Sequence, residues 1–148
     1  MGMAIAEPPA LLTAIASCVE DRNIDDIKLW YFHSMDHAGD TVLRPELLDR
    51  IHPRCMFLSP IERKLIAGQQ FYKNLIEFVP VAFSDSPKLL SEKVPLNLFV
   101  TTVSPMDRHG WFTFGISNDY STAAARSAEP AQTPGFGPGC RVSAPEGL

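Results

Sequence analysis

The sequence has few of the features that mark specialised classes of protein. Its three cysteines, Cys18, Cys55 and Cys140, are odd in number and far apart, which argues against a disulfide framework and a paired zinc motif. Lysine and arginine number 13 against 17 acidic residues, and the formal net charge of −4 gives no basic footprint for nucleic acid. No apolar run approaches the ~20 residues of a membrane helix, and residues 1–9 lack the regions of a signal peptide. We therefore expect a cytoplasmic protein that binds neither nucleic acid nor membrane, and we identify no metal site.

The composition and patterning are those of one globular domain. Of the 148 residues, 45% are hydrophobic and 20% are charged, which is ordinary for such a domain. Strand-like apolar runs alternate with helical segments, which predicts at least four strands separated by helices. The predicted strands are residues 27–32, 54–58, 78–83, 96–103 and 111–114, and the predicted helices are residues 7–19, 45–51, 60–68, 88–92 and a segment from residue 119. This order predicts an α/β fold with a mainly parallel sheet and flanking helices.

The composition changes at residue 129. Residues 129–148 are dominated by proline and glycine, have little apolar content and show neither the helical nor the strand period. Such a segment does not bury enough apolar surface to offset the entropy of ordering it. The sequence therefore predicts a domain over residues 1–128 and a disordered tail over residues 129–148.

One stretch, residues 96–120, places polar residues between predicted strands. The apolar run that opens it ends at Ser104-Pro105, because proline lacks a backbone donor and fixes φ. A polar turn at 107–110 follows, then a second apolar run and a second polar turn at 117–119. Proteins of the α/β class build their sites from such loops at the ends of strands.

Two arrangements of reactive residues have simpler interpretations. Ser104, Asp107 and His109 are the residue types of a hydrolytic triad, but no nucleophile-elbow sequence surrounds the serine. A tight turn, in which the aspartate and serine bond local backbone, is the simpler interpretation. His33 and His37 have the helical spacing of a metal pair but lack a third ligand. These patterns identify no catalytic residue.

Longer motifs carry a resemblance to a known family. The segments GMAIAEP, FLSPIERKLIAGQ, FVPVAFSDSPKLL and, above all, VSPMDRHGWFTFGISNDY resemble the N-terminal half of the acetyl-CoA hydrolase/transferase family. This family includes 4-hydroxybutyrate, succinyl and butyryl CoA-transferases. The resemblance covers Gly2 to about Ser127. The pattern S-P-x-D-x-H-G-x-F-x-x-G-x-S is long and specific, and its residues here are Ser104, Pro105, Asp107, His109, Gly110, Phe112, Gly115 and Ser117.

The resemblance implies a fold of the NagB/RpiA/CoA-transferase type and a ping-pong reaction. Two such halves face each other across the active site, and a glutamate attacks the acyl-CoA to give a mixed anhydride and then a glutamyl-CoA thioester. In this family the nucleophilic glutamate belongs to the C-terminal half, whose sequence is absent here. Glu7, Glu62, Glu77 and Glu92 lie in no matching motif, so none is a candidate nucleophile.

The resemblance also implies a wall of the acyl pocket. Gly2 and Gly110 would allow close approach of the backbone, and His109 or Asn118 could donate to a carboxylate. The alternative is that these residues only shape the loops. The substrate-binding residues implied are Gly2, Glu7, Pro8, Ser104, Asp107, His109, Gly110, Ser117 and Asn118.

Two departures from the family pattern leave the role of the chain open. The usual strand before the GMA turn is missing, and the proline/glycine tail replaces the expected continuation, which indicates a domain truncated at both ends. We expect an acyl-CoA and a small carboxylate as substrates, with no tightly bound cofactor, and a requirement for a C-terminal CoA-transferase half. A homo-oligomer is a further possibility. The alternatives are a fragment that binds CoA esters or a partner without catalysis, and one subunit of a split enzyme; transferase and hydrolase are not distinguished.

Overall fold

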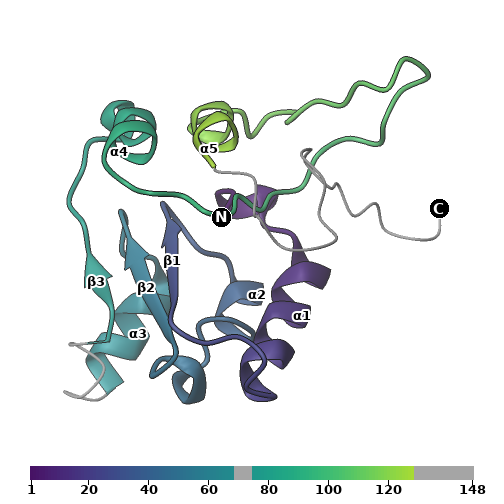
Figure 1. Ribbon diagram of the computed structural model, residues 1–148. Helices are drawn as coiled ribbons and strands as arrows, with labels where there is room; N and C mark the ends of the chain where they lie inside the picture. Colours follow the sequence, from purple (N-terminus) through teal and green to yellow (C-terminus); the bar gives the residue numbers. More distant parts are fainter. Residues whose placement is uncertain (69–74, 129–148) are drawn as a thin grey trace.

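A three-stranded parallel sheet organises the computed structural model, which describes residues 1–68 and 75–128 (Figure 1). The strands are β1 (Ile27–Tyr31), β2 (Ile51–Cys55) and β3 (Glu77–Phe78), in the order β1-β2-β3. The register aligns Ile27 with Ile51 and Tyr31 with Cys55, and it aligns Cys55 with Phe78. The predicted α/β class with a parallel sheet is therefore confirmed. The predicted tail, residues 129–148, lies outside the described residues.

Helices and short 3-10 turns connect and cover the strands. The helices are α1 (Pro9–Glu20), α2 (Asp36–Gly39), α3 (Pro60–Gly68), α4 (Ser86–Glu92) and α5 (Ser121–Ser127), and the 3-10 turns are η1 (Ala4–Ala6), η2 (Pro45–Leu47) and η4 (Phe83–Asp85). The helices predicted at the start of the chain, after residue 59, near residue 88 and after residue 119 are present. The prediction of a loop over residues 33–40 missed α2, and the predicted helix 45–51 is only the turn η2. Within the described ranges, no helix has the length and apolar character needed to cross a bilayer.

The predicted strands 96–103 and 111–114 are wrong. Neither segment joins the sheet, because their backbone groups bond elsewhere. The N–H of Gly2 donates to the carbonyl of Val100 (2.7 Å), and the N–H of Thr102 donates to that of Ala6 (2.8 Å). The first segment is thus held by the N-terminal turn. The second folds back on residues 104–107 as an isolated hairpin, which alone is a marginal structure in water.

Strand β2 begins earlier than predicted and contains a proline in its middle. The sequence predicted a strand over residues 54–58, with Pro53 ending the segment before it. The N–H of Met56 donates to the carbonyl of Tyr31 on β1 (3.1 Å), and successive residues of a strand point their N–H groups to opposite sides. The backbone nitrogen of Pro53 therefore faces β3, and the pairing of β2 with β3 begins only at the next residue, Arg54. A proline is tolerated there because no ladder bond is lost.

Two hydrophobic clusters lie on different parts of the sheet. The larger one joins α1, α2 and α3 to one face of the strands, and its fully buried members include Leu12, Val19, Tyr31, Ala38, Leu43, Ile51 and Cys55. The smaller one joins α4 and α5 to the segment after β2, and its buried members are Met56, Leu90, Val94, Tyr120 and Ala124. Figure 1 shows α4 and α5 beyond the arrowheads of the strands, so the second cluster covers part of their carboxyl ends.

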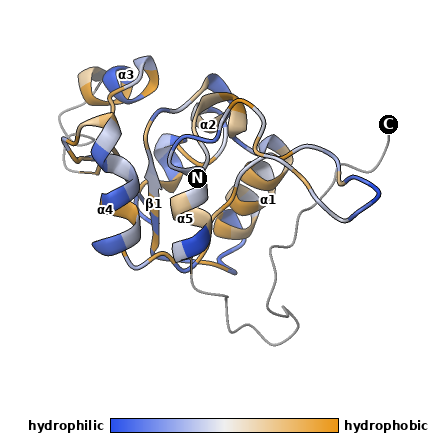
Figure 2. Ribbon diagram, turned by 90° about the horizontal axis from the view of Figure 1, so that it is seen from above, coloured by the Kyte–Doolittle hydropathy of each residue, from blue (hydrophilic) through white to orange (hydrophobic). Residues whose placement is uncertain are grey.

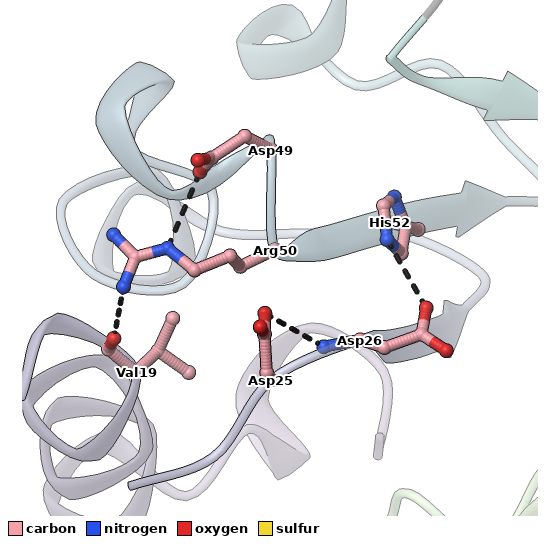
Figure 3. A network of polar contacts seen from close by, with 6 residues as sticks. All are labelled: Val19, Asp25, Asp26, Asp49, Arg50 and His52. Carbon is pink, nitrogen blue, oxygen red and sulfur yellow. Dashed lines mark hydrogen bonds and ion pairs between the residues drawn. The ribbon is translucent and has the colours of Figure 1, made fainter. Parts of the chain in front are cut away.

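Self-contained polar contacts occupy the amino ends of the strands (Figure 3). The guanidinium of Arg50 donates to the carbonyl of Val19 near the end of α1 and pairs with Asp49 (3.4 Å). A basic group is favourable at the C-terminus of a helix, where carbonyls lack partners. His52 on β2 lies 3.3 Å from the carboxylate of Asp26, which precedes β1.

A buried carboxylate joins the carboxyl ends of β1 and β2. Glu62, in the first turn of α3, is fully buried. Its side chain accepts hydrogen bonds from the hydroxyls of Tyr31 (2.9 Å) and Ser34 (2.6 Å). It also accepts bonds from the N–H of Ser59 (2.8 Å) and from the Ser59 hydroxyl. The Ser59 oxygen in turn accepts the N–H of Ile61 (3.2 Å), which completes a capping box. The predicted helix start is confirmed, and its glutamate, Glu62, also links the segments that follow β1 and β2 through hydrogen bonds.

We expect Glu62→Gln to destabilise the protein by about 3 kcal/mol, because an amide cannot accept all four of these bonds and leaves buried donors unpaired. Urea unfolding measures the change in free energy. Glu46→Gln is the matched control, since Glu46 is exposed in η2, and it should change stability by less than ~0.5 kcal/mol. Equal effects of the two substitutions would show that the network contributes little.

We expect Gly2→Ala to destabilise the protein by about 1–3 kcal/mol, because a Cβ there would lie 2.7 Å from the backbone oxygen of Ala6 and against the hydroxyl of Thr101. Gly39→Ala is the control, since its Cβ would meet only the flexible side chain of Ile61, at 3.2 Å. Thermal unfolding should show a clear fall in Tm for the first substitution and a small change of either sign for the second. A Gly2→Ala protein as stable as the parent would contradict the close packing of this turn.

Candidate functional site

The segments that leave β1 and β2 meet at the carboxyl edge of the sheet. Residues 32–35 follow β1, and residues 56–59 follow β2. In open α/β sheets, ligands bind in the crevice outside the carboxyl ends of the strands. The N-terminal turn, residues 2–7, lies at the same edge, because the N–H of Ala4 donates to the carbonyl of His33 (3.4 Å).

Four ring-bearing side chains gather at this edge, and we call them the aromatic cluster: Phe32, His33, Phe57 and Phe83. The ring of Phe32 stacks on Phe57 with centroids 6.4 Å apart and meets the edge of Phe83 at 4.8 Å. His33 lies 5.6 Å from Phe57. Phe57 and Phe83 remain 44% and 48% exposed, and Nδ1 of His33 is buried without a hydrogen-bond partner in the described part of the chain. The cluster offers an apolar wall with one unused polar atom.

The aromatic cluster was not anticipated from the sequence. The predicted strands 27–32, 54–58 and 78–83 each carried one of these phenylalanines at or next to the carboxyl end, but the register that places Phe32 near Phe57 comes from the structure. Phe83 arrives from η4, far away in the chain. No periodicity in the sequence relates these three positions.

The N-terminal turn is tightly fitted to its neighbours. Gly2 does permit a close backbone approach, as predicted, but the approach is to Ala6 and Thr101 of the same chain. Ala4 adopts φ of +49°, a left-handed conformation that costs a non-glycine residue roughly 1–2 kcal/mol. Pro8 is buried at the N-cap of α1, and its carbonyl accepts the N–H of Leu12 (3.0 Å). Such strain persists only where surrounding contacts hold the turn in place.

Glu7 ends this turn and is buried beneath the site. Its side chain is 5% exposed, and Oε1 accepts the N–H of Met35 (2.9 Å). Oε2 is buried and has no hydrogen-bond partner among the described residues. Burial raises the pKa of Glu7 from 4.5 to about 7; the Met35 N–H opposes this, the charge of Glu62 adds to it, and the amine of Met1 opposes it. The carboxyl group therefore changes its protonation close to neutral pH.

The loop 104–117 is organised by its own backbone. Ser104 exchanges two backbone-directed bonds with Thr113: its N–H donates to the Thr113 carbonyl (2.9 Å), and its hydroxyl accepts the Thr113 N–H (3.0 Å). The carboxylate of Asp107 accepts the N–H groups of His109 (2.8 Å) and Trp111 (2.9 Å). The ring of His109 lies against the guanidinium of Arg108 (3.1 Å) and not against Asp107. The three residues do not form a triad, and the turn interpretation describes them.

The remaining predicted residues are spread along this loop. Gly110 has φ of +85°, and a Cβ there would meet nothing within 4 Å, so the glycine serves the turn. Ser117 accepts the hydroxyl of Ser121 on its carbonyl (3.0 Å), and Asn118 accepts that of Thr122 on its side chain (2.5 Å). Figure 2 shows the loop projecting from the body of the protein with a hydrophilic tip.

The structure thus divides the predicted substrate-binding residues into two groups. Gly2, Glu7 and Pro8 lie at the carboxyl edge of the sheet, whereas the tip residues Asp107 and His109 are exposed on the projecting loop. Pairing of residues 100–102 with the N-terminal turn connects the two groups through the backbone. Contact of any of these residues with a substrate stays a prediction.

The other reactive side chains have structural roles. Nε2 of His37 lies 2.9 Å from the carbonyl of Pro9 and 3.5 Å from the hydroxyl of Thr13, at the start of α1. In the described ranges, no three His, Cys, Asp or Glu side chains are grouped to hold a metal ion. Burial, helped by the charge of Glu62, raises the pKa of Cys55 to about 12, so its thiol stays protonated.

Comparison with known proteins identifies relatives of this chain. No family model matches it. It is 36% identical over 127 residues to succinyl-CoA:cyclohexane-1-carboxylate CoA transferase of Geobacter metallireducens, a match that covers 86% of this chain and 27% of the relative. It is 39% identical over 54 residues to 4-hydroxybutyrate coenzyme A transferase of Clostridium kluyveri, covering 36% of this chain and 13% of that protein.

The fold comparison agrees with the sequence comparison. The crystal structure of RipA from Yersinia pestis is 45% identical in sequence and superimposes with a TM-score of 0.82, over 86% of this chain and 30% of that one. The chain therefore spans less than a third of the length of each of these proteins. The resemblance read from its motifs is confirmed: the chain is a homologue of the CoA transferases and corresponds to one part of these longer proteins.

Proposed function

We propose that the chain forms the N-terminal, acyl-binding part of an acyl-CoA:carboxylate CoA transferase. The observation that carries this proposal is the half-exposed aromatic cluster at the carboxyl ends of β1 and β2, in a chain homologous to CoA transferases. An apolar wall at this edge is suited to the hydrocarbon part of an acyl group, because burying apolar surface releases about 25 cal/mol for each Å². The substrates are then an acyl-CoA and a small carboxylate.

The apolar character of the cluster indicates the class of acyl group. Phe57 and Phe83 expose ring surface, and the unpartnered Nδ1 of His33 supplies one polar atom beside it. A carboxylic acid with an aliphatic or alicyclic body presents the matching surfaces. The relative from Geobacter metallireducens is named for cyclohexane-1-carboxylate, which belongs to this class.

The reaction is group transfer through a glutamyl-CoA thioester, with the nucleophile outside the described residues. A glutamate oxygen attacks the thioester carbonyl and the CoA thiolate leaves; the thiolate then attacks the glutamyl carbonyl of the mixed anhydride and releases the first carboxylate. Four of the described glutamates are poorly placed for this attack. Glu7 and Glu62 are buried, Glu77 pairs with Arg54 (2.9 Å), and Glu92 is exposed at the end of α4. This supports the family assignment of the nucleophile to a C-terminal half.

Three alternatives to this proposal differ in the fate of the acyl group or in what accompanies the chain. A hydrolase would pass the acyl group to water, and a non-catalytic fragment would bind CoA esters or a partner chain without turnover. A split enzyme would supply the C-terminal half as a separate subunit. The buried positions of Glu7 and Glu62 are compatible with all three.

The purified chain should show no transfer of CoA from acetyl-CoA to a carboxylate and no borohydride-reducible glutamyl thioester. Addition of the C-terminal part of a related CoA transferase should give turnover, because that part contributes the attacking carboxylate. Release of acyl-CoA products measured by liquid chromatography tests both statements. Thioester formation by the chain alone would place the nucleophile within it, and binding of acyl-CoA without turnover in the mixture would favour the non-catalytic alternative.

In the complemented enzyme, Phe57→Ala should raise KM for cyclohexane-1-carboxylate about tenfold, the effect expected when an apolar contact of roughly 1–2 kcal/mol is lost. Phe78→Ala is the matched control, because Phe78 is 48% exposed on β3 and lies outside the aromatic cluster. Steady-state kinetics on both variants, corrected for folded protein, give the comparison. If the two substitutions have the same effect on KM, the cluster does not bind the acyl group.

A further inference from the structure

Glu7 lies where three segments of the chain meet. Its Oε1 accepts a hydrogen bond from the N–H of Met35, in the segment that follows Phe32 and His33 of the aromatic cluster. The turn that it ends is tied to that segment a second time, by the bond from Ala4 to the carbonyl of His33. The same turn is tied to residues 100 and 102 by backbone bonds. Glu7 therefore lies at the junction of these three segments.

The second oxygen of Glu7 is the unusual part of this junction. Oε2 is shielded from solvent and has no partner in the described part of the chain. An ionised carboxylate with one oxygen unsatisfied is costly to bury, whereas the protonated acid is a neutral group. The burial of Oε2 without a partner among the described residues thus favours the protonated form, whereas the single bond from Met35 favours the ionised one.

In the described part of the chain, the titratable groups that interact electrostatically with Glu7 come from several elements. They are Glu62 on α3, Tyr31 on β1, Tyr120 before α5 and the amine of Met1. Burial raises the pKa of both tyrosines, so they are uncharged near neutral pH. Burial also lowers the pKa of the Met1 amine to about 5, which limits how far this amine favours the ionised form of Glu7. Glu62, which hydrogen bonds hold in place, is the neighbour whose charge raises the pKa of Glu7.

We propose that Glu7 is a positioning residue that keeps the N-terminal turn against the segment carrying Phe32 and His33 while its carboxyl group is protonated and can stay buried. Loss of the proton places a second negative charge beside Glu62, on a carboxyl group whose Oε2 is shielded from solvent. The Met35 N–H favours this ionised form, but it satisfies only Oε1, so the charge on Oε2 is hydrated only when the turn opens to water. That opening disorders the wall of the site. The effect on substrate affinity rests on the proposed function, whereas the contact between the N-terminal turn and the segment of Phe32 and His33 does not. The site is then competent at and below neutral pH and loses affinity above it.

The direction of the pH effect follows from linkage. Because the folded protein binds the Glu7 proton more tightly than the unfolded chain, the stabilisation is fully present below pH 4.5 and is lost as the pH rises through about 7. Protonation of an ordinary exposed carboxylate would end below pH 5 and leave no effect near neutrality.

NMR on the complete chain without ligand tests the proposal directly. With glutamate labelled at Cδ and backbone amides labelled with ¹⁵N, the Cδ of Glu7 and the amide of Met35 should titrate with the same midpoint near pH 7. Glu7→Gln, a neutral isostere, should abolish the transition of the Met35 amide and keep its low-pH position at every pH. Glu46→Gln should leave the transition unchanged. Different midpoints for the two nuclei, or an unchanged Met35 transition in Glu7→Gln, would overturn the proposal.

Kinetics of the complemented enzyme test the link to substrate. KM for cyclohexane-1-carboxylate should rise about tenfold between pH 6 and pH 8.5 in the parent and stay flat in Glu7→Gln, while Glu7→Ala should have a raised KM at every pH. A purely structural side chain would give the same pH profile in parent and Gln variant, and that result would overturn the positioning role. Absence of turnover in every variant would count against the proposed function, and the NMR titration would still decide the role of Glu7.

Discussion

The buried carboxylate of Glu62 is the constraint on which the carboxyl edge of the sheet depends. It accepts bonds from Tyr31 at the end of β1, from Ser34 beyond it, and from Ser59 at the start of α3. An unpaired carboxylate in this position would be strongly unfavourable, so the strand ends and the helix start are held in one arrangement. Phe32 directly follows Tyr31 and Phe57 lies two residues before Ser59, so the network holds the two segments that carry these stacked rings.

The two ends of the sheet are built differently, and the difference has a functional meaning. At the amino ends, Arg50 and Asp26 find partners within the chain, and their contacts leave the polar groups there satisfied. At the carboxyl ends, ring surface of Phe57 and Phe83 is exposed, and Nδ1 of His33 has no partner among residues 1–68 and 75–128. Unsatisfied and exposed groups in one place are costly for folding alone, which is why they point to binding.

Much of the local structure was predictable, because short-range signals decide it. Proline at the first positions of α1 and α3, the capping sequence of residues 59–62 and the apolar run of β1 act within a few residues, and the structure confirms all three elements. The wrong prediction of a strand over residues 96–103 has a long-range cause. Residues 96–103 have strand composition, but an extended segment enters a sheet only if a strand edge is free to receive it, and here the N-terminal turn takes its backbone bonds.

The sequence by itself determined the class of fold, the helix starts and the motifs of the CoA-transferase family, because these depend on residue order alone. Only the tertiary structure decided which residues share the site. In the folded chain, Asp107 bonds the loop backbone and Glu7 is buried near Glu62. Folding also brings Phe32, Phe57 and Phe83 together. Burial and proximity between distant segments set the protonation of Glu7 and the shape of the aromatic cluster, and neither quantity exists until the chain has folded.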